Sequence, residues 1–245
     1  MQLAAATANA FANDYQTFEV DPGISYPCFR SFDEFLDVDW LRSLDGPITE
    51  RIVQEIQTEK GDYFRNLYRL SSDTPYQPGV REVWLSRTDS TAPSEYLDMV
   101  DSTDLWHLTD KARDYPELME FIRTLPFERT GRMLIIYDNV GNEVPAHRDH
   151  MEPDVCNEFI WFRTNLRKPF YMLNAVTGEK KYVDSYSCWF DAVNQYHGTD
   201  ACPGLSFSIR VDGIFTDGFR RSIPRPVTNA ASTPALWACV DNNEQ

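Results

Sequence analysis

The chain has 245 residues, of which 42% are hydrophobic and 13% aromatic, and its 38 acidic and 23 basic side chains give a formal net charge of -15. This composition is typical of a globular protein with a substantial core, and it excludes a disordered chain. The negative charge disfavours nucleic acid and anionic membrane surfaces as partners, because like charges repel at long range. We therefore expect a small-molecule partner.

The five cysteines are odd in number and form no CxxC pair, which predicts reduced thiols in a cytoplasmic protein. The alanine-rich start of the chain lacks the basic region and the long apolar core of a secretory signal. No apolar run approaches the roughly 20 residues that a membrane-spanning helix needs. The sequence therefore predicts a soluble protein that does not enter a membrane.

The first half of the chain predicts helices and one strand. Apolar residues recur at helical spacing over 31–44, 47–60 and 115–126. Pro47 and Pro116 stand near the starts of the second and third segments, where a first helical turn accepts proline. Residues 81–87, "REVWLSR", read as a strand.

From residue 129 onward the pattern changes to short strands separated by turn signals, which is typical of a sandwich or barrel. The expected strands cover 132–140, 156–166, 168–176, 180–184, 185–193 and 204–216. Because helices come first and no linker separates them from the strands, we expect a single, mainly β domain in which helices brace one sheet of a cupin-like jelly roll. Its expected parts are a helical and mixed region over 1–128, the jelly-roll core over 129–216 and a C-terminal tail over 217–245.

The segment "VPAHRDH", residues 144–150, gathers two of the four histidines of the chain around one aspartate. Side chains alternate in an extended segment, so His147 and Asp149 emerge on one side while Arg148 points away. His197 follows a later predicted strand, where a neighbouring strand of a jelly roll would deliver it. Two histidines and one carboxylate form the facial triad that suits non-haem Fe(II), with positions left open for a co-substrate and dioxygen.

The strand expected over 204–216 carries a cation into the same roll. One face of this strand presents Ser206, Ser208, Arg210 and Asp212, and the other presents Phe207, Ile209 and Val211. The apolar face is expected to pack against the helices. A guanidinium held inside a roll needs an anion, and its planar fork matches a carboxylate at two points.

His147, Arg148 and Asp149, followed by His197 and Arg210, resemble the HxD...H...R signature of the Fe(II)/2-oxoglutarate-dependent oxygenases. The resemblance covers residues 129–216 and leaves the N-terminal third unassigned. It implies a double-stranded β-helix in which His147, Asp149 and His197 bind iron. It also implies that 2-oxoglutarate chelates the iron through its keto acid end and pairs its distal carboxylate with Arg210.

The same resemblance implies the reaction. 2-Oxoglutarate and O2 are converted to succinate and CO2, and an unactivated C–H bond of the substrate is attacked. Hydroxylation is the default outcome, while desaturation, ring formation and demethylation begin in the same way. The acidic surface and the single domain favour a small metabolite as substrate, such as an amino acid or a biosynthetic intermediate.

Three further positions are candidate contacts for the co-substrate. Tyr137 stands on the first core strand, where some members of the family place a tyrosine that hydrogen-bonds the co-substrate. Ser208 departs from the common pattern, because many members carry their hydroxyl residue two positions after the arginine, where this chain has Asp212. An acidic group there would repel 2-oxoglutarate unless it turned away or paired with a cation. Asn194 is a candidate for orienting a ligand near the metal.

Candidate substrate contacts are Arg163, Trp161, His150 and Trp237. A surface salt bridge is the alternative for Arg163, and a place in the core is the alternative for the two tryptophans. His150 is expected beside the metal as a substrate-facing or supporting residue, because a fourth protein ligand would block an open position.

Two other functions remain open from the sequence. A non-redox metal-binding cupin would hold a metal without any link to 2-oxoglutarate, although cupins typically use more histidines and do not need a buried Arg210. A jelly-roll module that binds a small ligand would ignore both Fe(II) and 2-oxoglutarate. Conversion of 2-oxoglutarate to succinate distinguishes the oxygenase from both.

Overall fold

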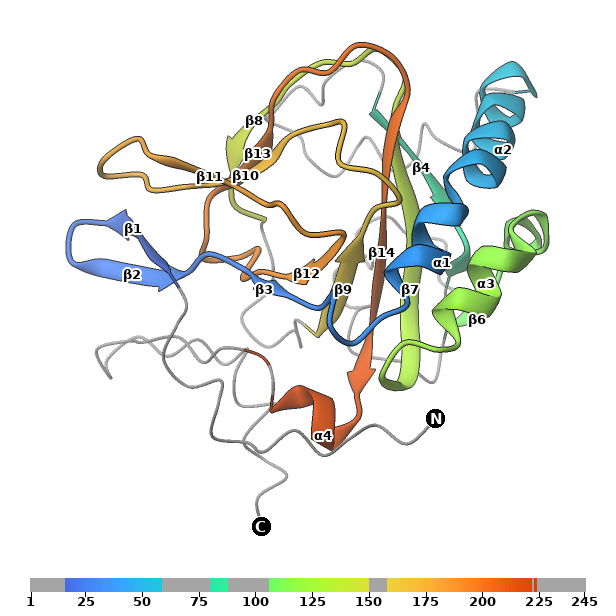
Figure 1. The fold of residues 1–245 in the computed structure, drawn as a ribbon, viewed down its shortest axis with the longest axis horizontal. Coiled ribbons are helices and arrows are strands. Elements are labelled where there is room, and N and C mark those ends of the chain that lie inside the picture. The colour runs from blue at the N-terminus through green and yellow to red at the C-terminus, as the bar shows by residue number, and fades with distance from the viewer. Residues whose placement is uncertain (1–15, 59–79, 88–105, 150–157, 222, 224–245) are drawn as a thin grey trace.

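Two antiparallel sheets form the body of the protein in a computed structural model that describes residues 16–58, 80–87, 106–149, 158–221 and 223 (Figure 1). The six-stranded sheet runs, in order, β3 (Arg30–Ser31), β12 (Ser187–Trp189), β9 (Phe159–Phe162), β14 (Ser206–Phe215), β7 (Phe127–Asp138) and β4 (Val80–Trp84). The four-stranded sheet runs β11 (Lys180–Tyr182), β10 (Phe170–Leu173), β13 (His197–Thr199) and β8 (Val144–His147). From β7 to β14 the chain passes back and forth between the two sheets, so the predicted jelly roll is confirmed.

The remaining elements lie around these sheets. Two short hairpins pair β1 (Thr17–Asp21) with β2 (Ile24–Pro27) and β5 (Ser86–Arg87) with β6 (His107–Leu108). The helices are α1 (Val38–Ser43), α2 (Asp45–Thr58), the 3-10 helix η4 (Asp110–Asp114), α3 (Pro116–Ile122) and α4 (Asp217–Arg220). The three predicted helices are therefore present: α1 and α3 are shorter than the periodic segments that predicted them, and α2 begins two residues before its segment.

Helices α1, α2 and α3 lie together beside the six-stranded sheet, on the side away from the four-stranded sheet (Figure 1). Strand β9 packs against the helices with one face and against the four-stranded sheet with the other. Its Phe162 meets Phe121 of α3 with ring centroids 5.6 Å apart, whereas Trp161 stacks on Phe170 of the opposite sheet at 4.5 Å. Alternate side chains of a strand point to opposite faces, so β9 contributes to the helix contact and to the interior of the roll. The expected bracing of one sheet by helices is confirmed.

The long ladder between β7 and β14 determines which side chains enter the roll. Arg210 lies opposite Leu134 and also opposite Trp161 of β9, so these three side chains share the interior face. Ile209 and Val211, one residue away on either side, are fully buried in the core that includes the helices. The predicted division of this strand into a polar and an apolar face is thus confirmed.

The N-terminal region contributes strands as well as helices. Strand β4, which forms one edge of the six-stranded sheet, is the strand expected over 81–87, whereas β3 at the other edge was not expected. Strands β8 and β13 were not delineated in advance. Each has only three or four residues, too few to show a hydrophobic period of its own.

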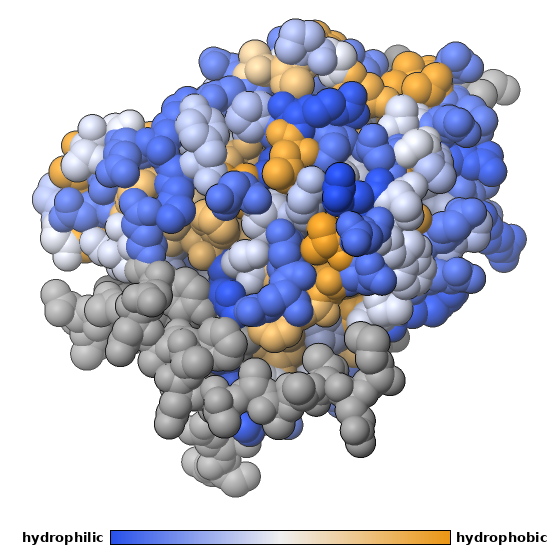
Figure 2. Space-filling model, viewed as in Figure 1, coloured by the Kyte–Doolittle hydropathy of each residue, from blue (hydrophilic) through white to orange (hydrophobic). Residues whose placement is uncertain are grey.

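Polar residues dominate the face of the molecule drawn in Figure 2, where apolar residues form small separate groups. Within the described ranges, no helix is both long and apolar enough to cross a membrane. Cys28, Cys188 and Cys202 are free thiols, and burial raises the pKa of the Cys28 thiol to about 12.

Candidate metal centre

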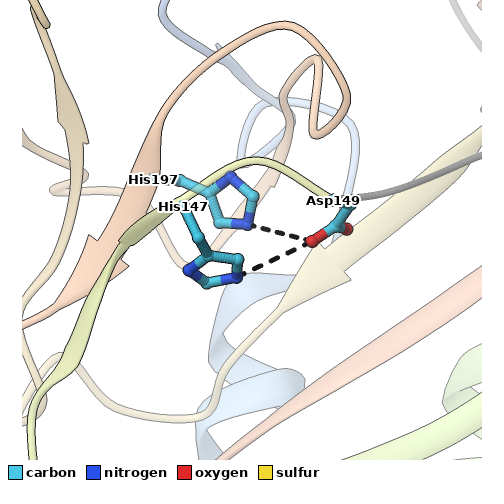
Figure 3. A group of neighbouring side chains, drawn as sticks. All are labelled: His147, Asp149 and His197. Carbon is cyan, nitrogen blue, oxygen red and sulfur yellow. Dashed lines mark ion pairs between the residues drawn. The ribbon is translucent and has the colours of Figure 1, made fainter. Parts of the chain in front are cut away.

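His147, Asp149 and His197 converge at the edge of the four-stranded sheet (Figure 3). His147 ends β8 and lies directly opposite His197, which begins β13. Asp149 follows β8, and its backbone N–H donates to the carbonyl oxygen of Ala192 at 2.7 Å, which fixes the carboxylate beside the two rings. Its Oδ1 lies 3.7 Å from Nε2 of His147 and 3.5 Å from Nε2 of His197. One ligand atom from each residue lies within 4.8 Å of the others.

This spacing fits one metal ion. Ligand atoms about 2.1 Å from a metal and at right angles to one another lie about 3 Å apart. The two histidine–aspartate separations of 3.5 and 3.7 Å exceed that value by a fraction of an ångström, and all three ligand atoms lie within 4.8 Å of one another, so side-chain rotations can bring them to ligand spacing. Two imidazole nitrogens and one carboxylate oxygen are the donor set of a facial triad, which leaves half of an octahedral shell to other ligands.

Both imidazoles are held with the same nitrogen toward Asp149. Nδ1 of His147 lies 2.9 Å from the carbonyl oxygen of Pro145, and Nδ1 of His197 lies 3.1 Å from that of Gln195. A carbonyl oxygen only accepts hydrogen bonds, so each Nδ1 carries the hydrogen and each neutral ring has its lone pair on Nε2. Such bonds orient ligating histidines in metal sites.

The protonation states at the site suit metal binding. Burial lowers the pKa of His147, and the neighbouring His197 lowers it further, so the ring of His147 is neutral at neutral pH. Burial opposes the charge of Asp149, but the neighbouring His197 and the charge of Arg210 outweigh it and hold the pKa of this carboxyl well below its usual range. A metal requires a neutral imidazole and an ionised carboxylate as ligands.

The site is open on one side and closed on the other. The side chain of His147 is 46% exposed, whereas that of His197 is 7% exposed. The ring of His197 lies 4.9 Å from Phe190 and 6.0 Å from Phe170, centroid to centroid. Phe170 in turn stacks on Trp161, which is therefore a core residue at the base of the site, as the alternative for this tryptophan anticipated.

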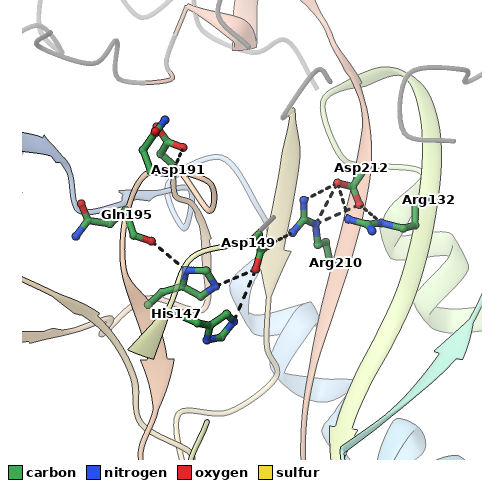
Figure 4. Close-up of polar contacts among 9 residues, drawn as sticks. Arg132, His147, Asp149, Asp191, Gln195, Arg210 and Asp212 are labelled. Carbon is green, nitrogen blue, oxygen red and sulfur yellow. Dashed lines mark hydrogen bonds and ion pairs between the residues drawn. The ribbon is translucent and has the colours of Figure 1, made fainter. Parts of the chain in front are cut away.

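Arg210 lies beside the triad, inside the roll (Figure 4). Its Nη1 is 3.4 Å from Oδ2 of Asp149, and its guanidinium carbon lies 3.9 Å from the ring centroid of Phe159. The other edge of the guanidinium contacts Asp212, which also accepts from Arg132. Asp212 is thus paired with cations, one of the two conditions under which an acidic residue at this position was expected to be compatible with 2-oxoglutarate.

Two candidate co-substrate residues on the long ladder have different positions. Ser208 shares the interior face with Arg210 and lies opposite Ile136. Tyr137 lies opposite Phe207, on the other face, where it is buried in the core that includes the helices. This placement differs from the expectation, because Tyr137 stands one residue out of phase with the interior positions of β7.

Asn194 and Arg163 hold the chain in place in this structure. Asn194 donates its backbone N–H and its side-chain amide to the carboxylate of Asp191, at 3.1 and 2.9 Å. Arg163 is buried and donates to backbone carbonyl oxygens, a different role from either the substrate contact or the surface salt bridge that the sequence left open. The three carbonyls belong to Ser185, Lys168 and Val183.

His150 and Trp237 lie outside the described residues, so their expected substrate contacts remain predictions. Arg148 contacts Tyr196 and not the triad, with its guanidinium carbon 4.8 Å from the ring centroid of Tyr196. Arg132 and Gln195, both near the centre, were not singled out from the sequence. Arg132 stands in phase with the interior positions of β7, a signal available in the sequence, whereas Gln195 contributes its backbone carbonyl, which any residue could supply.

Comparisons with known proteins show similarity in three dimensions only. No protein-family model matches the sequence, and no curated protein matches it. A prolyl-4-hydroxylase from Pseudomonas putida superposes with a TM-score of 0.41 and 14% identity over 75% of this chain and 90% of that chain. A prolyl hydroxylase from Trichoplax adhaerens, in complex with a peptide fragment of a hypoxia inducible factor, gives 0.44 and 11% over 75% and 81%. The Arabidopsis thaliana dioxygenase for auxin oxidation, in complex with 2-oxoglutarate, gives 0.39 and 14% over 77% and 83%. These likenesses are distant, so the chemistry of this chain is inferred from its own residues.

Proposed function

We propose that the chain is an Fe(II)- and 2-oxoglutarate-dependent oxygenase that hydroxylates an unactivated C–H bond of a small metabolite. The observation that carries the proposal is the meeting of His147, Asp149 and His197, with both Nε2 atoms and one carboxylate oxygen directed at a common point. The buried Arg210 beside Asp149 favours an oxygenase over a non-redox cupin, because it supplies the cation that a dicarboxylate co-substrate needs.

Each residue has a defined task in this proposal. The two imidazoles and Asp149 hold Fe(II) and leave adjacent positions for 2-oxoglutarate and O2. The iron supplies the activation of O2 that is coupled to oxidation of 2-oxoglutarate to succinate and CO2. Arg210 binds the distal carboxylate of 2-oxoglutarate and fixes its orientation. The aromatic side chains around His197 exclude water from the closed side of the centre.

A small molecule is the proposed substrate, with an amino acid or a biosynthetic intermediate as the class to screen first. The formal charge of -15 disfavours nucleic acids and anionic surfaces through long-range repulsion. The half-exposed His147 marks the side from which a substrate reaches the metal.

The test is formation of succinate from 2-oxoglutarate with Fe(II) and O2, before any substrate is known. We expect slow turnover by the wild-type protein and none by Asp149→Ala. His107→Ala is the matched control, because His107 is exposed on β6 and is not a member of the triad. Binding of metal without any conversion of 2-oxoglutarate would contradict the oxygenase and leave a cupin.

A further inference from the structure

We propose that Asp212 is a positioning residue that holds Arg210 by one edge and thereby aims its guanidinium at the metal centre and at the co-substrate carboxylate. Arg132 is the second cation that neutralises Asp212 in this role. The inference rests on the proposed function. It assigns to Asp212 and Arg132 an effect on co-substrate affinity, although neither residue is expected to touch the metal.

The hydrogen bonds of Arg210 divide its guanidinium into two sides. Nε lies 3.0 Å and Nη2 lies 2.9 Å from Oδ1 of Asp212, so one edge of the fork is engaged by a single carboxylate. Nη1, on the remaining side, lies 3.4 Å from Oδ2 of Asp149 (Figure 4). The group that Arg210 offers to an anion is therefore the end that faces the metal centre.

A ring fixes the plane of the same guanidinium. The guanidinium carbon lies 3.9 Å from the ring centroid of Phe159, a side chain that is fully buried. Arg210 is thus held by Asp212 at one edge and by Phe159 across one face. An arginine that is already ordered loses less conformational entropy when an anion binds, and this raises the affinity for that anion.

Arg132 makes an acidic residue acceptable at this position. Its Nε donates to Oδ2 of Asp212 at 2.9 Å and its Nη2 to Oδ1 at 3.2 Å. Asp212 is 2% exposed, and a carboxylate buried so deeply requires cationic partners. With two guanidinium groups around it, Asp212 can hold Arg210 without repelling the anion that Arg210 binds.

The contact between Asp212 and Arg132 lies at a β-bulge between β14 and β7. The register between β14 and β7 shifts between Val211 and Gly213, which places Asp212 at the irregular position. A Cβ atom on Gly213 would lie 2.3 Å from the carbonyl oxygen of Arg129, so the close approach of the strands here requires glycine. Bulges re-aim side chains next to active sites, and here Gly131 and Arg132 of β7 stand against the single residue Asp212 of β14.

Three variants distinguish the positioning of Arg210 by Asp212 from an effect of local net charge on the affinity for 2-oxoglutarate. Asp212→Ala raises the local charge by one, and Arg132→Met lowers it by one. The double variant leaves the total charge unchanged and removes the contact of Asp212 with Arg210. If charge alone sets co-substrate affinity, Asp212→Ala binds 2-oxoglutarate more tightly than wild type and the double variant binds it equally. If Asp212 positions Arg210, both Asp212→Ala and the double variant lose affinity by roughly tenfold or more.

The experiment measures the Kd of 2-oxoglutarate in anaerobic, Fe(II)-loaded protein from the visible absorption of the chelated keto acid, together with the Fe(II) affinity of each variant. We expect Fe(II) affinity to stay within about twofold of wild type, since the triad is intact, while 2-oxoglutarate affinity falls. Asp212→Ala leaves two buried arginines without this carboxylate and is the variant at risk of unfolding. The double variant also removes Arg132, so it leaves one buried arginine fewer without a carboxylate, and it tests the proposal even where Asp212→Ala does not fold.

Glu158→Ala is the matched control, because it breaks a buried carboxylate–arginine pair with Arg220 and leaves the contacts of Arg210 in place. It should lower stability without weakening 2-oxoglutarate binding. A double variant that binds 2-oxoglutarate as tightly as wild type overturns the positioning role and leaves the oxygenase proposal intact. A wild-type protein that binds Fe(II) but no 2-oxoglutarate overturns both.

Discussion

His147 lies directly opposite His197 in the ladder between β8 and β13, and their imidazole centroids are 4.5 Å apart. Opposed residues in an antiparallel pair project to the same face, so this pairing alone brings two candidate metal ligands together. Asp149 then joins them from the same side because side chains alternate along an extended chain. A slip of one residue in this short ladder would turn one histidine to the opposite face and abolish the site.

Gly198 is expected to control that register. A Cβ atom at this position would lie 2.6 Å from the carbonyl oxygen of Val144 and 2.7 Å from the hydroxyl of Tyr171. Gly198→Ala must therefore push β8 away from β13. We expect a loss of about 1–3 kcal/mol in the free energy of unfolding, measured by urea denaturation of the metal-free protein, together with weaker Fe(II) binding in calorimetry.

Gly46→Ala is the control for this substitution. Gly46 lies in α2, and a Cβ atom there meets nothing within 4 Å, so the variant should be as stable as wild type or up to about 1 kcal/mol more stable. Equal stability and equal metal affinity in Gly198→Ala and wild type would show that the ladder tolerates separation, contrary to the site described above.

Asp138 stabilises the turn that leads into β8, and its contribution should depend on pH. Its Oδ1 accepts the backbone N–H groups of Val140 and Gly141, both at 2.9 Å, and its Oδ2 pairs with Lys168. Burial opposes ionisation, but the bond from Lys168 and those from the two N–H groups outweigh it, so the pKa of Asp138 is lowered in the folded protein. The stabilisation is therefore complete above about pH 4 and is lost as pH falls through the folded-state pKa.

Asp138→Asn should cost about 1–3 kcal/mol at pH 7, because the amide no longer neutralises Lys168. The difference from wild type should shrink as the pH is lowered below about 4, where the wild-type carboxylate also takes up a proton. Urea denaturation at pH 7 and at pH 3 measures both values. A difference that is the same at the two pH values would mean that the charge of Asp138 contributes nothing.

Arg163 is expected to act on stability and not on ligand binding. It caps three backbone carbonyl oxygens, so Arg163→Met removes their hydrogen-bond donors and should lower the free energy of unfolding by about 3 kcal/mol. The affinities for Fe(II) and 2-oxoglutarate should stay at their wild-type values. Unchanged stability combined with impaired turnover of a substrate would instead restore the substrate contact that the sequence left open.

The candidate metal ligands could be identified from the sequence because histidine is rare in this chain and two of the three residues are close together along it. His147 and Asp149 stand two residues apart in an extended segment, and their convergence follows from the alternation of side chains. The partner His197 was predictable only as the histidine nearest a later strand. Its exact pairing with His147 depends on a long-range register that short strands such as β8 and β13 do not encode by themselves.

The role expected for Tyr137 came from the family resemblance, and the alternation of side chains along β7 places this residue on the other face of the strand. Alternation along β7 after the bulge puts Arg132, Leu134 and Ile136 on the interior face, so Tyr137, one residue out of phase with them, faces the helices. The same rule identifies Arg132 as an interior cation. Its partnership with Asp212 depends on the bulge in the ladder, and bulges are set by the packing of two strands and not by either strand alone.

The most direct test of the account is an anaerobic titration of the metal-free protein with Fe(II) and then 2-oxoglutarate, followed by the visible absorption of the chelated keto acid. We expect the band for wild type and for the control His107→Ala, no band in His147→Ala, and a requirement for much more 2-oxoglutarate in Arg210→Ala. Iron binding without any band would contradict the oxygenase, and no iron binding at all would contradict the metal centre itself.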